Sequence, residues 1–276
     1  MNIVAIGLDV LREARHRHWL VALAAAITLI LLVLGFSLQL EVVDGALAST
    51  RLFGAVVGTG GTSADIVLRS VFQATTYLIF YGGLIFGIVA CSDFAPSLLS
   101  PGRIEPLLAL PVRRWELLAG TFAGVLSLSV AGALYGAGGL TLVLGFKTGI
   151  WSIRPIAASL LASVAFAAIY GTMLVTSLFV RSATISAAVG GMLLIGGIVA
   201  GHRTTIATAF QQGWGRSAFL GFTFIVPRIS ALAHASANFA SSAADQTPFW
   251  PVLAGFFFFV AGMLAIGTWK LEQRDF

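Results

Sequence analysis

The sequence predicts an all-α, polytopic membrane protein, and three observations lead to that class. Of its 276 residues, 58% are hydrophobic and only 10% are charged. The mean hydropathy is +0.96, whereas a soluble domain of this size needs far more charge on its surface. The charged residues also cluster between long apolar runs, as they do in helical membrane proteins. We therefore expect a single transmembrane domain over residues 1–276.

Six apolar runs are each long enough to cross a bilayer. About 20 residues, at about 1.5 Å per residue, span a hydrocarbon core of about 30 Å. The runs lack the period-two alternation of barrel strands, so we expect helices. The predicted spans are roughly Trp19–Leu40, Val71–Cys91, Leu117–Gly145, Ile156–Val180, Ser182–Gly201 and Phe249–Trp269. Only Arg181 and Ser182 separate the fourth span from the fifth, so the turn there must be tight.

Residues 1–18 predict an interfacial helix before the first span. Val4, Leu8, Leu11 and Ala14 recur at helical spacing, while charged residues face elsewhere. The alternative is a solvated basic tail that only sets the topology. Arginines beside the first span favour a cytoplasmic N-terminus, and six spans return the C-terminus to the same side. The expected location is the inner (cytoplasmic) membrane, with both termini cytoplasmic.

No energy source is visible within the chain. The predicted spans carry no Asp, Glu, Lys or Arg near their middle, as ion-coupled transporters generally require, and the four histidines lie outside the spans. Gly58–Thr62 lacks the lysine of a Walker A phosphate loop and is interpreted as a flexible turn. The single cysteine, Cys91, excludes a disulfide framework and a cysteine-based metal cluster. We expect no enzyme activity, cofactor or metal site, so energy for uphill transport must come from a partner.

A charged, proline-broken stretch, Ser100–Gly120, lies between the second and third spans. Its sequence RIEPLLALPVRRWELLAG resembles the cytoplasmic signature of the ABC-2 type transporter permeases, and the entry into the first span at residues 12–20 is also similar. Arg103 stands where that family usually has Thr, and Thr121 where it usually has Lys. The acidic residues of the pattern are reduced to Asp93. Within the family, the chain resembles permeases of multi-copper-enzyme maturation, such as those of nitrous-oxide-reductase assembly.

This resemblance implies a permease subunit that forms a homodimer or heterodimer and binds separate ABC ATPase subunits, which hold the ATP and Mg. Its function would be export or lipid-type extrusion, or the coupling of ATP hydrolysis to a periplasmic partner. The resemblance places a cytoplasmic coupling segment at residues 93–116. Its expected ATPase-coupling residues are Asp93, Phe94, Leu98, Leu99, Arg103 and Glu105. An elbow that aims the third span is expected from Pro111, Arg113, Arg114 and Glu116.

The external loop at residues 202–247 contains an apolar run, Phe219–Val226, that is too short to cross the membrane. It resembles the half-membrane re-entrant helices that ABC-2 permeases place before the last span. Such backbone needs protein or a cavity to cover it. Phe222, Phe224 and Pro227 would then form an outer gate, and the alternative is a helix pair lying on the surface.

Two further interpretations concern partners and packing. A non-transporting membrane anchor or scaffold within a larger complex fits the same composition, and unlike a permease it would not need an ATPase. Basic residues do not interleave with aromatics, so no nucleic-acid partner is expected. The pairs Gly83–Gly87, Gly132–Gly136 and Gly197–Gly201 match the small-xxx-small pattern and predict close helix packing within the chain.

Overall fold

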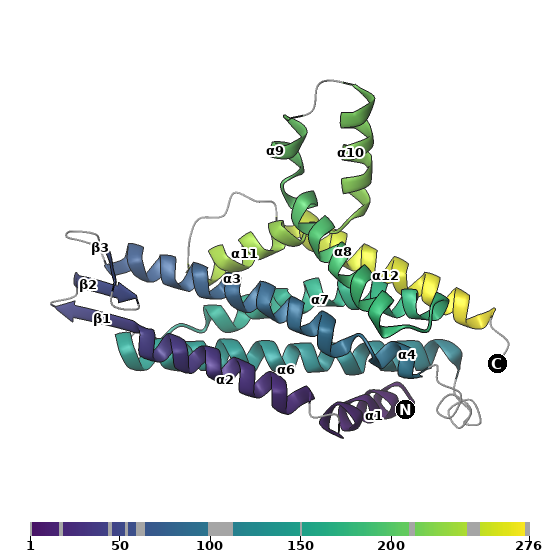
Figure 1. Ribbon diagram of the computed structural model, residues 1–276, viewed down its shortest axis with the longest axis horizontal. Helices are drawn as coiled ribbons and strands as arrows, with labels where there is room; N and C mark the ends of the chain where they lie inside the picture. Colours follow the sequence, from purple (N-terminus) through teal and green to yellow (C-terminus); the bar gives the residue numbers. More distant parts are fainter. Residues whose placement is uncertain are drawn as a thin grey trace.

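The computed structural model describes residues 2–16, 19–43, 46–52, 55–58, 64–98, 113–149, 151–209, 213–241 and 249–273. These residues form a helical bundle with one small sheet at its end (Figure 1). The helices are α1 Asn2–His16, α2 Trp19–Ser37, α3 Ala64–Cys91, α4 Phe94–Leu98, α6 Arg114–Thr148, α7 Arg154–Phe179, α8 Ala183–Gly201, α9 Arg203–Ala207, α10 Trp214–Ile225, α11 Ile229–Ser241 and α12 Phe249–Glu272. The strands are β1 Leu38–Val43, β2 Ala46–Leu52 and β3 Ala55–Gly58.

Several of these helices are long and apolar enough to cross a membrane. Among the described residues, five qualify by length and composition, and they lie within Arg69–Ser97, Arg114–Lys147, Arg154–Phe179, Ala183–Gly201 and Phe249–Glu272. Two bent pairs qualify only when each is taken as one unit: α1 with α2, bent by 67°, and α10 with α11, bent by 59°. The protein is therefore a membrane-embedded helical chain with between five and seven candidate spans.

The break between α7 and α8 falls where the sequence predicted a tight turn. Helix α7 ends at Phe179, and the Ser182 amide donates to the Val180 carbonyl at 2.7 Å. The Ser182 hydroxyl then accepts from the amide of Ile185 at 3.5 Å, which caps the start of α8. The chain thus reverses within three residues (180–182), and the two helices remain separate.

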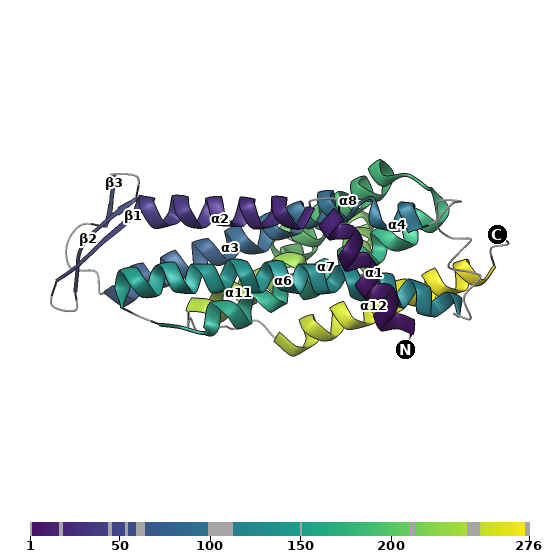
Figure 2. The ribbon, with the colours of Figure 1, turned by 90° about the horizontal axis from the view of Figure 1, so that it is seen from below.

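Helix α7 forms the centre of the bundle, with α3, α6, α8, α11 and α12 packed around it. Small residues recur on it, and Ala158, Ala165 and Ala168 are completely buried. Small side chains let neighbouring helices approach closely in lipid, where packing rather than water exclusion drives association. Figures 1 and 2 show α2, α3, α6 and α7 running along the long axis, with α1 and the end of α12 toward the same end of the bundle.

Helix α1 is present where the sequence predicted a helix, and one of its faces packs on α6. Val10 and Ala14 are buried, with 2% and 1% of their surfaces exposed, and together with Gly7 they lie against α6. Val4 and Leu8, which the sequence placed on the apolar face of an interfacial helix, are 68% and 50% exposed. The face packed on α6 is the one whose small residues permit close approach, whereas Val4 and Leu8 point away from the bundle.

The predicted glycine pairs pack unevenly. A Cβ at Gly87 would lie 2.6 Å from the Phe166 ring, one at Gly132 would lie 2.9 Å from Leu23, and one at Gly197 would lie 2.9 Å from the Pro227 carbonyl oxygen. These glycines therefore serve close packing within the chain. Gly83 does not, because a Cβ there would meet nothing within 4 Å.

A three-stranded antiparallel sheet follows α2, in a region for which the sequence predicted no strands. Leu38 of β1 pairs with Leu52 of β2, and Thr50 of β2 pairs with Gly58 of β3. The segment is short and contains four valines, which favour strands. It lies at the end of the bundle opposite α4 (Figure 1).

Candidate functional site: the charged end and an outer polar cluster

The predicted coupling segment begins with a short helix, α4, at the end of α3. Asp93 is exposed, and its carbonyl accepts from the amide of Ser97 at 3.0 Å as the helix starts. Phe94 and Ala95 are only 3% and 1% exposed, because α4 packs against α7. Phe94 was expected to enter a partner's groove, but its ring instead anchors α4 to the chain's own core. Of the residues expected to contact an ATPase, Leu99, Arg103 and Glu105 lie outside the described residues, as does Pro111 of the elbow, while α4 ends at Leu98.

The described part of the predicted elbow caps α6. The Arg113 amide donates to the Glu116 carboxylate at 3.0 Å, which satisfies one of the unpaired donors at the helix start. Because an arginine side chain has no acceptor, the reciprocal half of a capping box is not made. The carboxylate also lies in the first turn of α6, where the helix dipole favours negative charge.

Arg114 connects the start of α6 to the end of α12. Its Nη1 donates to the carbonyls of Leu271 and Glu272, each at 3.1 Å. These carbonyls belong to the last turn of a helix, where a cation is favourable. The α12 end also approaches α7, since Lys270 Nζ lies 5.2 Å from the centre of the Phe179 ring. The bonds of Arg114 therefore hold together the start of α6 and the end of α12, which lie 157 residues apart in the sequence.

The three residues of the predicted outer gate lie on α10 and just after it. Phe222 and Phe224 are 67% and 76% exposed on α10, while Pro227 is buried where α10 turns into α11. With α9, α10 forms an arm that projects away from the bundle (Figure 1). Arg203 of α9 lies 6.0 Å from the centre of the Phe224 ring and helps to join the two helices of the arm.

A polar cluster at the base of this arm was not predicted. The Tyr77 hydroxyl of α3 forms a hydrogen bond with Nδ1 of His234 on α11, and the His234 ring lies edge-on to His202 at 5.7 Å between centres. His202 Nδ1 lies 3.2 Å from the Ser230 hydroxyl, which donates to the Ile198 carbonyl at 3.0 Å. One helical turn before Tyr77 on α3 and one turn after His234 on α11, Gln73 Nε2 donates to Asn238 Oδ1 at 3.2 Å. We call Gln73, Tyr77, His202, Ser230, His234 and Asn238 the outer polar cluster.

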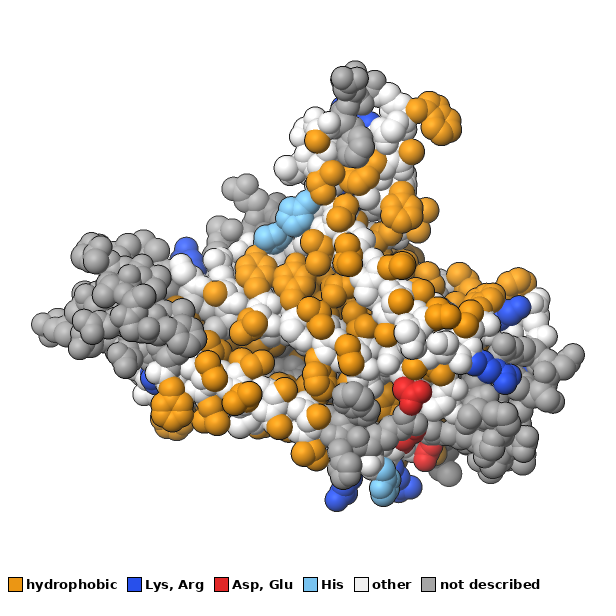
Figure 3. Space-filling model, viewed as in Figure 1, with side chains coloured by type: hydrophobic (Ala, Val, Ile, Leu, Met, Phe, Trp, Pro, Cys, Tyr) orange, Lys and Arg blue, Asp and Glu red, His pale blue; other side chains and the backbone are white. Residues whose placement is uncertain are grey.

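The outer polar cluster opens to the surface between apolar side chains. His234 is exposed and Tyr77 half-buried, and Figure 3 shows histidine side chains bordered by apolar surface below the arm. Tyr77 lies only eight residues beyond Arg69, where its candidate span begins, which is about 12 Å along the helix. Polar groups at such a depth usually face a cavity or a partner and not lipid.

No single sequence signal could have found this cluster. Tyr77 and His234 are 157 residues apart, and His202 and Ser230 are 28 apart. Placing the histidines in an external loop hid their proximity, since only the return of α11 along α3 and α8 brings them together. Within the part of the chain that the structure describes, no group of three or more His, Cys, Asp or Glu residues could hold a metal ion.

Comparisons with known proteins give no family assignment. No protein-family model matches the chain, and no curated protein matches it.

Proposed function

We propose that this chain is the membrane subunit of an ATP-driven transporter of the ABC-2 type. In this proposal it dimerises, binds separate ATPase subunits at the end that carries α4, and couples ATP hydrolysis to export. The observation that carries the proposal is how α4 and the start of α6 are held at that end of the bundle. A short helix presents Asp93 to solvent while Phe94 fixes it to the bundle, and the stretch that resembles the permease signature leads from there to the capped start of α6.

This arrangement suits the transmission of mechanical force from a bound ATPase to the helices of the bundle. A force on α4 would reach the central helix α7 directly, because Phe94 and Ala95 are packed on it. A force on the start of α6 would reach α12 through the two bonds from Arg114. Movement of a bound ATPase would thus act on three helices of the bundle at once. Packed interfaces respond to such small shifts by switching between discrete arrangements.

The outer polar cluster is the best candidate for a pathway surface. Its side chains are polar, and the two histidines among them are exposed on a face made by α3, α8 and α11. A second copy facing this surface would enclose it and remove it from lipid. Phe222 and Phe224 would then need the second copy to complete an outer gate, since they project from the bundle of one chain.

The test is purification of the tagged chain from its native membrane, followed by measurement of vanadate-sensitive ATP hydrolysis and identification of co-purifying proteins. The proposal expects a Walker A protein in near-stoichiometric amount. Asp93→Lys should release it, whereas Arg154→Glu, an exposed charge reversal at the start of α7 and the opposite end of the bundle, should not. An anchor or scaffold would instead purify with other membrane subunits and without ATPase activity. That result would contradict the proposal.

A further inference from the structure

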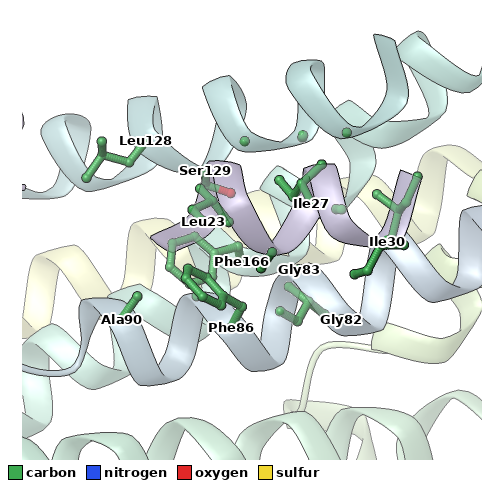
Figure 4. Close-up of a pocket in the computed structure, with 18 of the residues that line it drawn as sticks. Leu23, Ile27, Ile30, Gly82, Gly83, Phe86, Ala90, Leu128, Ser129 and Phe166 are labelled. Carbon is green, nitrogen blue, oxygen red and sulfur yellow. The ribbon is translucent and has the colours of Figure 1, made fainter. Parts of the chain in front are cut away.

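A long apolar groove runs along the side of the bundle between α2, α3 and α6, with α7 as its floor. Figure 4 shows Leu23, Ile27 and Ile30 of α2 on one wall, and Gly82, Gly83 and Phe86 of α3 on another. The space has a volume of about 220 Å³. It belongs neither to the charged end nor to the outer polar cluster.

Two adjacent glycines keep this groove open without packing against any described part of the chain. A Cβ at Gly82 or Gly83 would meet nothing within 4 Å. One turn further along α3, a Cβ at Gly87 would lie 2.6 Å from the Phe166 ring, so that glycine is explained by packing within the chain. Glycine is a poor helix former compared with alanine. Gly82 and Gly83 therefore leave the backbone of α3 open to an occupant of the groove.

The chemistry of the lining restricts the occupant to hydrocarbon. Among the described residues that line the groove, Ser129 alone carries a hydroxyl, amide or charge. Its hydroxyl donates to the Ser163 hydroxyl at 3.3 Å. A polar ligand, or a column of water, would find almost no partners here, and apolar cavities of this kind remain dry.

The length and position of the groove match one acyl chain. Its lining on α3 extends from Leu78 to Cys91, and these fourteen residues cover about 20 Å of helix. One leaflet provides about half of the hydrocarbon core, roughly 15 Å, so the groove covers the full depth of one leaflet. The groove ends at Ala14 of α1 and Phe94 of α4, so it belongs to the leaflet on the side of those helices.

We propose that this groove binds one acyl chain of a membrane phospholipid from the leaflet on the side of α1 and α4. The proposal rests on the chain being embedded in a bilayer and does not depend on transport. A bound acyl chain would fill the space beside Gly82 and Gly83 and would connect α2 to α3. A side chain from a second copy is the competing occupant, and the experiment separates the two.

The experiment uses the full chain in vesicles containing a phosphatidylglycerol with a photoreactive diazirine in the middle of one acyl chain. After irradiation, attached lipid is mapped by peptide mass spectrometry. We expect adducts along Leu78–Phe86 of α3 and Leu23–Ile30 of α2. The double variant Gly82→Leu with Gly83→Leu should reduce these adducts at least fivefold. The control is Gly262→Leu, another exposed helical glycine with nothing within 4 Å of its Cβ, and it should leave them unchanged.

Adducts on the lipid-exposed face of α12, around Phe257 and Phe258, serve as the internal reference in every sample. If the double variant fails to fold, Ala133→Phe blocks the groove from α6 and takes its place. Three results would overturn the proposal. The first is wild-type adducts on α12 but not in the groove, and the second is groove adducts that persist in the blocked variants. The third is cross-linking of groove residues to a second protein chain in place of lipid.

Discussion

The packing of α1 on α6 leads to a prediction that can be worked out from distances. A Cβ at Gly120 would lie 2.7 Å from Ile6 Cβ and 3.0 Å from the Ile3 carbonyl oxygen. The substitution Gly120→Ala must therefore displace α1, because the oxygen belongs to the backbone and cannot rotate away. Overpacking of this kind typically costs about 1–3 kcal/mol. Gly138, on the same helix, has nothing within 4 Å of its Cβ, so Gly138→Ala is the matched control.

Both substitutions gain about the same helix propensity, roughly 1 kcal/mol. The difference between the two variants therefore isolates the clash with α1. We expect Gly120→Ala to be less stable than Gly138→Ala by about 1–3 kcal/mol in chemical unfolding of the purified chain in micelles. If α1 opens on its own, its amides should exchange with deuterium roughly 5–150 times faster in Gly120→Ala. Equal stability and equal α1 exchange in the two variants would refute the packing of α1 on α6 as described.

Three other predictions concern the charged end and the outer polar cluster. Phe94→Ala should lower the free energy of unfolding by roughly 3–5 kcal/mol because it leaves a cavity under α4. Asp93→Lys should lower it by less, because Asp93 is exposed, and should chiefly reduce ATPase recovery. A larger loss of stability in Asp93→Lys than in Phe94→Ala would contradict the orientation of α4. Arg114→Ala should lower the free energy of unfolding by about 1 kcal/mol, at the low end for a lost hydrogen-bond partner, because one of its two bonds is partly buried and the other exposed. The variant should also increase deuterium exchange in the last turn of α12 rather than elsewhere. With the native cysteine replaced, His234→Cys should react quickly with a water-soluble maleimide in membranes. Phe258→Cys, which is also exposed, should react slowly, because thiolates form poorly in lipid. Equal rates would argue against a hydrated face at the cluster.

The sequence located most helices well because a span needs a long apolar run whatever it packs against. The break between α7 and α8 was also predictable, since Arg181 and Ser182 interrupt two such runs. The packed face of α1 was not predictable from hydrophobicity. In lipid an apolar side chain can be exposed at little cost, so Val4 and Leu8 point outward while Gly7 and Ala14 pack.

The features that the sequence did not predict depend on contacts between distant segments. Phe94 was assigned to a partner because nothing in the local sequence shows that α7 passes beneath α4. The hydrogen bond between Tyr77 and His234 depends on α11 returning alongside α3, which no local pattern encodes. The bonds from Arg114 to the end of α12 are of the same kind, although a basic residue at the start of α6 was expected to matter.

The most direct test of the proposed function is the ATPase activity of the complex purified with this chain and reconstituted in lipid. We expect vanadate-sensitive hydrolysis that depends on a Walker A partner. Asp93→Lys should remove this activity from the purified complex, and Arg154→Glu should retain it. A chain that is folded in lipid, recovered with its native partners and devoid of any associated ATPase would contradict the proposal that it is a permease subunit.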